Sequence, residues 1–192
     1  MATLKDLDEP ILLTITAIEP MKGLDILVKA VSMVNRKMKV LIIGQIRDND
    51  FMLYLKSMIK KLKLEDKINF IGWIDNDKLD TYYKSATLFV HPSRDESLGV
   101  VILEALTCGL PVIATSVGGI PDMISQGKNG ILVPPNNPKE LANAISLLLD
   151  NKALRMEFSL NAKQILYRDY YRNRITLKEA FYQSMKELEL EK

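Results

Sequence analysis

Six short apolar runs recur along the chain, and each is separated from the next by a segment with helical spacing. Most of these runs are continuous rather than alternating. Strands buried on both faces have this pattern, because helices cover both sides of a parallel sheet. The sequence therefore predicts an α/β fold, a Rossmann-like three-layer α/β/α domain on a parallel sheet of about six strands. The predicted strands are residues 11–15, 40–43, 67–71, 87–90, 112–114 and 130–133.

The segments between the runs carry apolar residues three and four positions apart, as amphipathic helices do. Ligands of parallel sheets bind beyond the carboxyl ends of the strands, so residues that follow strands are candidates for a site. Residues 168–192 are predicted to form a C-terminal crossover that packs against a neighbour. The predicted helices are residues 22–33, 51–62, 77–84, 100–107, 138–149, about 153–167 and about 175–190.

Composition narrows the class of protein. The 192 residues, 47% of them hydrophobic and 26% charged, are ordinary for one soluble globular domain. A net charge of +2 gives no reason to expect a nucleic acid partner. Cys108 is the single cysteine, so no disulfide within the chain is expected, which fits a cytoplasmic location. We find no apolar signal core at the N-terminus and no apolar run long enough to span a bilayer.

Two carboxylates, Glu96 and Glu104, stand eight positions apart around the start of a predicted helix. Glu96 lies in the loop before this helix, and Glu104 lies in its second turn. The first N–H groups of a helix have no partner inside it and favour an anion. A phosphate bound there, flanked by carboxylates that can hold hydroxyl groups, is the chemistry of a nucleotide-sugar site. The predicted binding residues of this stretch are Glu96, Ser97, Leu98, Gly99, Val100 and Glu104.

The same stretch resembles the Glu-x7-Glu signature of retaining glycosyltransferases of family 4, written E-x-F-G-x-x-x-x-E-A, with Leu98 in place of the usual aromatic residue. The resemblance extends over about residues 10–185 and implies the C-terminal, donor-binding half of the two-domain GT-B fold. Many matches at fixed spacing make it specific. The other matching elements are Pro92-Ser93, Gly109-x-Pro111-Val112, Gly118-Gly119 and Asn129-Gly130.

The loop after the first strand resembles the family's G-R-L-x-x-x-K-G, whose arginine and lysine hold the donor diphosphate. Lys22-Gly23 is kept, whereas Thr16 stands at the first glycine position and Ala17 at the arginine position. Lys22 can neutralise charge on a leaving diphosphate, but lysine does not replace the two-pronged contact of a guanidinium. The missing arginine is expected to lower turnover by about 100-fold or more. The simpler interpretation of Lys22 is that it begins an exposed helix.

Residues 70–74 resemble the family's F-x-G-x-V, in which backbone groups just past the glycine meet the nucleobase. The resemblance assigns Ile74 to that contact through its N–H and C=O groups. Trp73 either stacks on the base or packs into the protein, and packing is the commoner role for a lone tryptophan after a strand.

Other features have simpler interpretations. Residues 48–50 and 75–77 both spell D-x-D, but each directly precedes a predicted helix, where Asp and Asn are preferred caps, so no metal site is predicted. His91, the only histidine, is expected in a hydrogen-bonded structural role, with proton transfer as the alternative.

Lys56, Lys60, Lys61 and Lys63 form a basic helix face. Such a face is usually solvated, and peripheral contact with anionic lipid at the cytoplasmic membrane face is the alternative. The basic and aromatic residues at 167–174 are expected in the crossover.

The resemblance implies a hexosyltransferase that uses a nucleotide-diphosphate sugar, a glycan or lipid-type acceptor, retention of configuration and no metal or other cofactor. Lys22 and Glu96 are the predicted catalytic residues, Thr16 and Ile74 join the donor-binding set, and Glu104 is predicted to accept both ribose hydroxyls.

The family's N-terminal acceptor domain has no counterpart in residues 1–192. The chain is therefore expected to be a fragment, to need a partner chain, or to be a donor-binding module that is weak or inactive alone. A non-catalytic nucleotide-sugar sensor is the alternative from another class.

Overall fold

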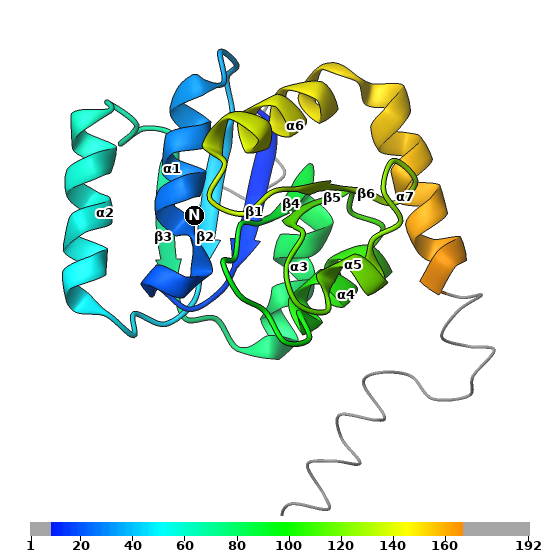
Figure 1. The fold of residues 1–192 in the computed structure, drawn as a ribbon, viewed down its shortest axis with the longest axis horizontal. Helices are drawn as coiled ribbons and strands as arrows, with labels where there is room; N and C mark the ends of the chain where they lie inside the picture. Colours follow the sequence, from blue (N-terminus) through cyan, green and yellow to red (C-terminus); the bar gives the residue numbers. More distant parts are fainter. Residues whose placement is uncertain (1–8, 167–192) are drawn as a thin grey trace, which may run out of the picture.

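A six-stranded parallel sheet forms the centre of the molecule (Figure 1). The computed structural model describes residues 9–166. The strand order is β3-β2-β1-β4-β5-β6, so the chain builds one half of the sheet outward from β1 and then returns beside β1 to build the other half. The predicted fold class is confirmed. The strands are β1 (Ile11–Ile15), β2 (Lys39–Ile43), β3 (Ile68–Gly72), β4 (Leu88–His91), β5 (Val112–Thr115) and β6 (Gly130–Val133).

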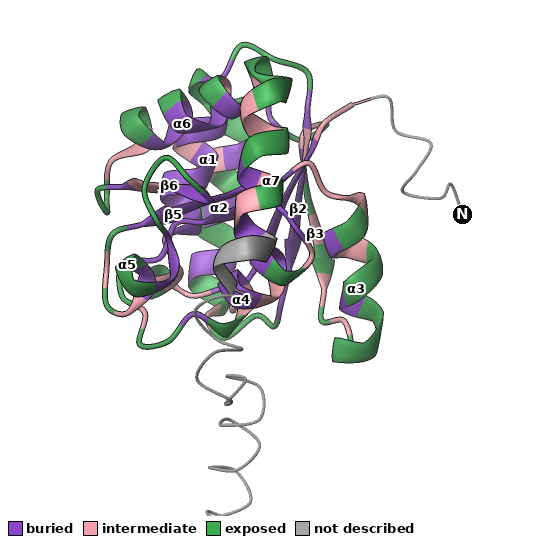
Figure 2. Cartoon of the chain, turned by 90° about the vertical axis from the view of Figure 1, so that its right-hand side faces the viewer, coloured by how far each residue is buried: buried purple, intermediate pink, exposed green. Residues whose placement is uncertain are grey.

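Helices cover both faces of the sheet, and Figure 2 shows the strands buried between helices whose outer sides are exposed. One face carries α1 (Leu24–Met33), α2 (Asn49–Lys61) and α6 (Pro138–Asp150). The other carries α3 (Asn76–Ser85), α4 (Val100–Thr107) and the four-residue α5 (Ile120–Met123), which the sequence did not predict. The last described helix, α7 (Lys152–Leu166), contacts both α4 and α6.

The continuous apolar runs follow from this layering. Successive strand side chains point to opposite faces of a sheet. Leu12 and Val90 therefore pack with α1, α2 and α6, while Leu13 and Phe89 pack with α3 and α4. All four side chains are fully buried, so neither face of the central strands has room for a polar residue without a partner.

The predicted helix at 22–33 is divided at Gly23. Residues Pro20–Lys22 form a short 3-10 turn, and α1 begins only at Leu24. Gly23 has φ of 65°, and a Cβ atom there would lie 2.0 Å from the carbonyl oxygen of Pro92. The loop after β4 passes too close for any side chain at this position. Lys22 therefore ends a turn at the sheet's rim, and the expectation that it begins a helix is wrong.

The predicted helix caps and the predicted packing of Trp73 can be compared with the structure. The Asp48 carboxylate accepts a hydrogen bond from the Phe51 N–H group at 2.8 Å, which confirms helix capping there. Asp75 precedes α3 but makes no capping hydrogen bond, and its carboxylate instead accepts one from Lys78 at 2.8 Å. Trp73 is 60% exposed, so the expectation that it packs into the protein is wrong.

The lysines at 56, 60, 61 and 63 are all exposed on or after α2, as predicted for a solvated face. Among residues 9–166, no helix has the length and apolar character needed to cross a membrane. The predicted helix at 175–190 and the basic aromatic cluster at 167–174 lie outside the described residues.

Candidate functional site

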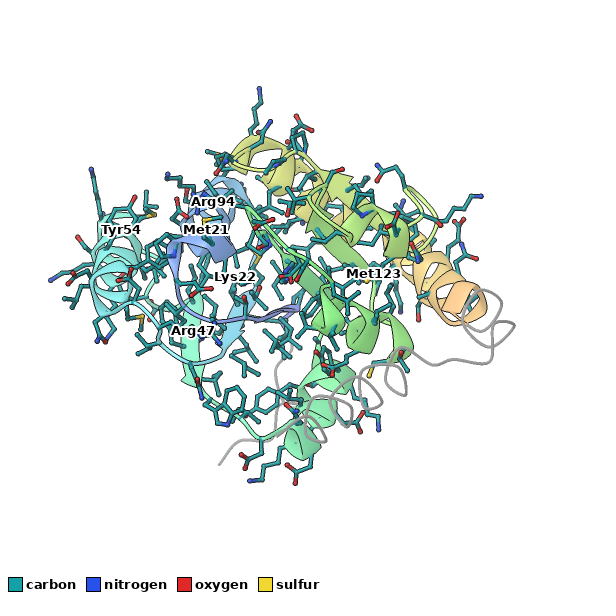
Figure 3. All side chains as sticks on the ribbon, turned by 60° about the horizontal axis from the view of Figure 1, so that its bottom comes forward. Met21, Lys22, Arg47, Tyr54, Arg94 and Met123 are labelled. Atoms are coloured by element: carbon teal, nitrogen blue, oxygen red, sulfur yellow. The ribbon has the colours of Figure 1, made fainter. Side chains whose placement is uncertain are left out.

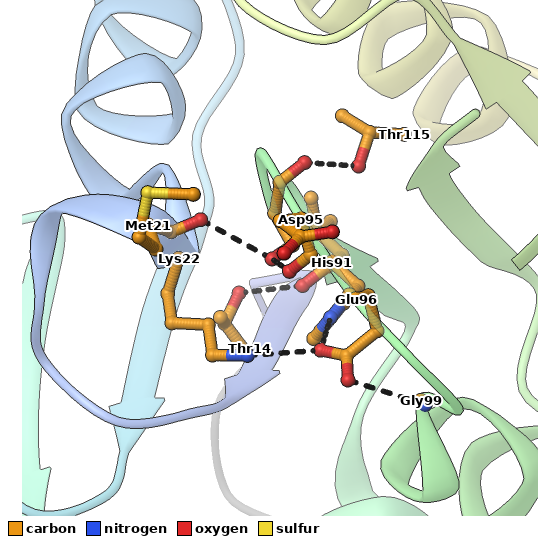
Figure 4. Close-up of polar contacts among 10 residues, drawn as sticks. Thr14, Met21, Lys22, His91, Asp95, Glu96, Gly99 and Thr115 are labelled. Atoms are coloured by element: carbon orange, nitrogen blue, oxygen red, sulfur yellow. Dashed lines mark hydrogen bonds and ion pairs between the residues drawn. The ribbon is translucent and has the colours of Figure 1, made fainter. Parts of the chain in front are cut away.

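Lys22 and Glu96 meet at the carboxyl-end rim of the sheet. Strands β1 and β4 are neighbours in the sheet, and Lys22 follows the first while Glu96 follows the second. The Lys22 Nζ atom donates a hydrogen bond to Glu96 Oε2 at 3.1 Å, although the residues are 74 positions apart (Figure 4). Both predicted catalytic residues therefore lie in one place, at the topological switch point of the sheet, where ligands of such folds bind.

The Glu96 carboxylate accepts hydrogen bonds from three donors. Besides Lys22, His91 Nε2 lies 3.1 Å from Oε2, and the Gly99 N–H group donates to Oε1 at 3.3 Å (Figure 4). A carboxylate only accepts, so His91 carries its hydrogen on Nε2. The His91 bond is the main cause that lowers the pKa of Glu96 to about 2; burial opposes it, and the Lys22 bond and charge add to it. The predicted hydrogen bonding of His91 is confirmed, and its partner is a predicted catalytic residue.

The lowered pKa of Glu96 predicts a pH-dependent contribution to stability. Because the folded-state pKa of about 2 lies below the ordinary value of 4.5, the contribution is complete above pH 4.5 and is lost as the pH falls toward 2. It amounts to about 3 kcal/mol at most. We expect Glu96→Gln to unfold at a lower temperature than the wild type at pH 6, and the difference to shrink by pH 3.

The control for this prediction is Glu65→Gln, because Glu65 is exposed. Its thermal unfolding should follow the wild type at every pH. If the difference in unfolding temperature between Glu96→Gln and the wild type stays constant from pH 6 to pH 3, the lowered pKa of Glu96 is contradicted.

The turn between Glu96 and α4 lies at the surface. Leu98 is 42% exposed and Val100, the first residue of α4, is 39% exposed. Ser97 is exposed as well, whereas Gly99 is buried. The predicted phosphate-binding turn is therefore open to a ligand, although the Gly99 N–H group is already engaged by Glu96.

Gly118 and Gly119, in the loop after β5, pack against the backbone of the Glu96 loop. A Cβ atom on Gly118 would lie 1.7 Å from the Glu96 carbonyl oxygen, and the Gly119 N–H group donates to that oxygen at 3.3 Å. Gly118 also has φ of 50°, which glycine adopts without strain. The glycine pair therefore lets the loop after β5 pass directly against the Glu96 loop and fix its backbone.

Glu104 lies in the second turn of α4 and is half-buried. The Tyr83 hydroxyl, from α3, donates a hydrogen bond to its Oε2 atom at 2.8 Å. Burial, and then the charge of Glu104, raise the pKa of the Tyr83 phenol, so the hydroxyl stays protonated and donates. Nothing in the local sequence indicated this partner.

Arg94 connects three loops of the rim and was also missed from the sequence. Its Nη2 atom donates to Asp25 Oδ2 at 2.9 Å, and its Nη1 atom lies 2.8 Å from Oδ1. Its Nε atom donates to Asn136 Oδ1 at 2.7 Å, and its N–H group donates to the Met21 carbonyl at 2.8 Å. Figure 3 shows Met21, Lys22 and Arg94 grouped at this rim.

Asp25 is the only charged residue among the buried residues of α1, and its place between Leu24 and Ile26 was the one sequence signal for this cluster. Burial of its carboxyl group opposes ionisation, but the hydrogen bond and charge of Arg94 outweigh that effect and lower the pKa of Asp25.

The remaining predicted residues, Thr16 and Ile74, also follow strands of the sheet. Thr16 follows β1 and is half-buried, with its N–H group bonded to the Ile43 carbonyl at 2.9 Å. Ile74 follows β3, which is separated from β4 by β2 and β1. The β3 and β4 axes are thus about 14 Å apart, at about 4.8 Å a strand. Within residues 9–166, no three His, Cys, Asp or Glu side chains are grouped to hold a metal ion.

Comparison with known proteins decides the family. Residues 2–165 match the family described as glycosyl transferases group 1. The chain belongs to this family. An uncharacterized glycosyltransferase of Methanocaldococcus jannaschii is 34% identical over 167 residues, which cover 85% of this chain and 42% of that protein. The chain thus spans less than half the length of this family member.

Solved structures agree with the assignment. The Anabaena protein HepE, in complex with UDP-glucose, has a TM-score of 0.83 and 26% identity, covering 93% of this chain and 49% of that one. The C-terminal domain of the Francisella tularensis group 1 protein LpcC has a TM-score of 0.77 and 27% identity, covering 84% of this chain and 88% of that domain. The fold is that of the C-terminal domain of GT-B glycosyltransferases.

Proposed function

We propose that this chain is the donor-binding half of a retaining glycosyltransferase of family 4, which moves a hexose from a nucleotide-diphosphate sugar to a glycan or lipid-type acceptor. The observation that carries the proposal is the meeting of Lys22 and Glu96 beside the exposed turn that begins α4. A cation, a helix N-terminus and a carboxylate are thereby presented together, as a diphosphate joined to a sugar requires.

The ion pair between Lys22 and Glu96 suggests how a donor would enter. The Lys22 side chain is only 22% exposed, and its ammonium group is paired with Glu96. When Lys22 transfers its hydrogen bond to a phosphate oxygen, Glu96 Oε2 gains an acceptor site for a sugar hydroxyl. Binding of the phosphates would in this way prepare Glu96 for the sugar. We assign Lys22 and the first N–H groups of α4 to the diphosphate, Glu96 to the sugar and Glu104 to the ribose.

The proposed transfer needs no nucleophile from the protein. The bond between the anomeric carbon and the β-phosphate oxygen breaks, and an acceptor hydroxyl oxygen forms its bond to the same carbon on the same face. The departing phosphate takes the hydroxyl proton. Lys22 stabilises the charge that develops on this phosphate, which is the role of a fixed cation in such reactions, and we propose that no metal ion is required.

Ala17 favours a second candidate, a nucleotide-sugar-binding protein without turnover. The residue lies in the loop after β1, where an alanine side chain offers no hydrogen bond to phosphate. In this alternative the same rim binds the donor, but the leaving diphosphate lacks the charge stabilisation needed for an appreciable rate.

A binding screen separates the proposals. Calorimetry with UDP-, GDP- and ADP-sugars should show saturable binding of at least one, and a hydrolysis assay on that ligand then measures turnover. Slow hydrolysis that depends on Lys22 supports the transferase, and binding without hydrolysis supports the second candidate. Absence of binding by all three classes would contradict both.

Glu104→Gln tests the ribose assignment within that screen. An amide accepts more weakly than a carboxylate, and one of its two ends donates. We expect the affinity for the selected nucleotide sugar to fall by about 1–3 kcal/mol, the range for hydrogen bonds to charged groups. Unchanged affinity in calorimetry would remove Glu104 from the site.

The proposed acceptor site concerns the part of the relatives that this chain does not cover. The chain spans less than half of the M. jannaschii relative and of HepE. We propose that a second domain or a partner chain supplies the acceptor site across the Lys22–Glu96 rim. A location in the cytoplasm, with the basic face of α2 at a membrane, stays a prediction.

A further inference from the structure

Tyr83 is held rigidly in the core beneath α4. Tyr83 is 3% exposed, and its ring packs against the buried Phe89 with ring centroids 5.8 Å apart. The position of the phenol oxygen is therefore fixed by packing in the core. That oxygen donates to Glu104 Oε2 at 2.8 Å and lies 3.4 Å from the Val101 carbonyl oxygen.

The Glu104 side chain, by contrast, is less restrained by packing, because it is only half-buried. Its neighbours Leu103 and Ala105 are buried, while Glu104 and Val101 are only half-buried, on the side of α4 next to α3. A glutamate side chain loses considerable rotamer freedom when it is held in one direction. The hydrogen bond from Tyr83 supplies that restraint. Because Tyr83 uses one lone pair of Oε2, the other oxygen and the remaining lone pair stay available as acceptors.

We propose that Tyr83 is a positioning residue that aims the Glu104 carboxylate at the ribose hydroxyls and thereby sets a preference for ribonucleotides over 2′-deoxyribonucleotides. The inference rests on the proposed function, in which Glu104 binds the ribose. It adds Tyr83, which acts through Glu104 and does not touch the ligand. It also adds a selectivity that can be measured by comparing a nucleotide with its 2′-deoxy form. The energetic basis is general, since a ligand that lacks the hydroxyl leaves a prepared acceptor without a partner.

A purely structural role for Tyr83 predicts a different result. The phenol would then need Glu104 only as a partner for a buried hydroxyl. Its loss would lower the melting temperature but would leave the ratio of ribonucleotide to deoxyribonucleotide affinity unchanged. The ratio is therefore the deciding measurement, because it compares two ligands on the same folded protein.

The experiment uses Tyr83→Phe with Tyr82→Phe as its matched control. Tyr82 is the neighbouring residue on α3 and is half-buried. UDP, GDP and ADP are titrated into the wild type by calorimetry, and the tightest binder is compared with its 2′-deoxy form. We expect the affinity ratio to fall by about tenfold in Tyr83→Phe, in line with the loss of a hydrogen bond to a charged group, and to be unchanged in Tyr82→Phe.

Tyr83→Met serves if Tyr83→Phe does not fold. Methionine also lacks the hydroxyl group and adapts its shape to a buried site, while Glu104 is left intact, so the ratio should fall similarly. A wild-type ratio in whichever variant folds overturns the inference while the proposed function stands. A wild type that binds its nucleotide without discriminating against the deoxy form also overturns it. Binding of none of the three nucleotides overturns the proposed function itself.

Discussion

Arg94→Met should lower the free energy of unfolding by about 3 kcal/mol, because it removes the nearer of the two cations beside the buried Asp25 carboxylate and leaves only Lys29, whose Nζ lies 3.6 Å from Oδ2. Asp25 is 6% exposed, and Arg94 supplies two of its closest contacts at 2.8 and 2.9 Å. The same substitution removes the hydrogen bond to Asn136 and so releases one of the three loops that Arg94 holds together. Chemical denaturation of the variant and the wild type measures the loss.

A second substitution tests the cause. Asp25→Asn removes the buried charge, so adding it to Arg94→Met should recover part of the lost stability, which two independent effects would not do. Arg36→Met is the control, since its guanidinium pairs with Asp150 on the surface and exposed pairs contribute about 0–1 kcal/mol. A cost for Arg94→Met no larger than the cost for Arg36→Met would contradict the argument.

Lys22→Met and Glu96→Gln should change the affinity for a bare nucleoside diphosphate in opposite directions. Lys22→Met removes a charged hydrogen-bond donor to phosphate, and we expect affinity to fall about 10- to 100-fold. Glu96→Gln removes the ion pair that Lys22 must leave, so affinity for the same ligand should rise by about 2- to 5-fold. With a nucleotide sugar this gain should disappear, because an amide in place of the Glu96 carboxylate would hold the sugar less well.

Lys60→Met controls for the loss of one positive charge, because Lys60 is exposed on α2. Its affinity should match the wild type at 0.15 M salt, where exposed charges separated by more than about 8 Å are largely screened. If Glu96→Gln weakens the binding of the bare diphosphate, Lys22 does not exchange partners as we propose.

The layered fold could be predicted because the apolar runs are themselves a consequence of burial on both faces. Leu12 and Leu13, adjacent in sequence, face opposite layers and are both fully buried, so the local pattern contains the three-layer arrangement. Lys22 and Glu96 could be placed at the rim for a related reason, since any loop that follows a parallel strand reaches that edge.

The restraints on the site could not be predicted, because they join residues far apart in sequence. Arg94 and Asp25 are 69 positions apart, and Tyr83 and Glu104 are 21 apart on different helices. The break at Gly23 likewise depends on the loop at Pro92 rather than on local propensity. The local sequence pattern thus predicts which residues lie at the rim, whereas the orientation of their side chains depends on tertiary contacts.

The place of β1 in the sheet has a consequence for assembly. The pairing of β1 with β4 is the seam between the half of the sheet built first in sequence and the half built second. Lys22 belongs to the first half, while His91, Arg94 and Glu96 belong to the second. A folding intermediate in which both halves were formed but the seam was open would have every strand and helix and still not bring these four side chains together.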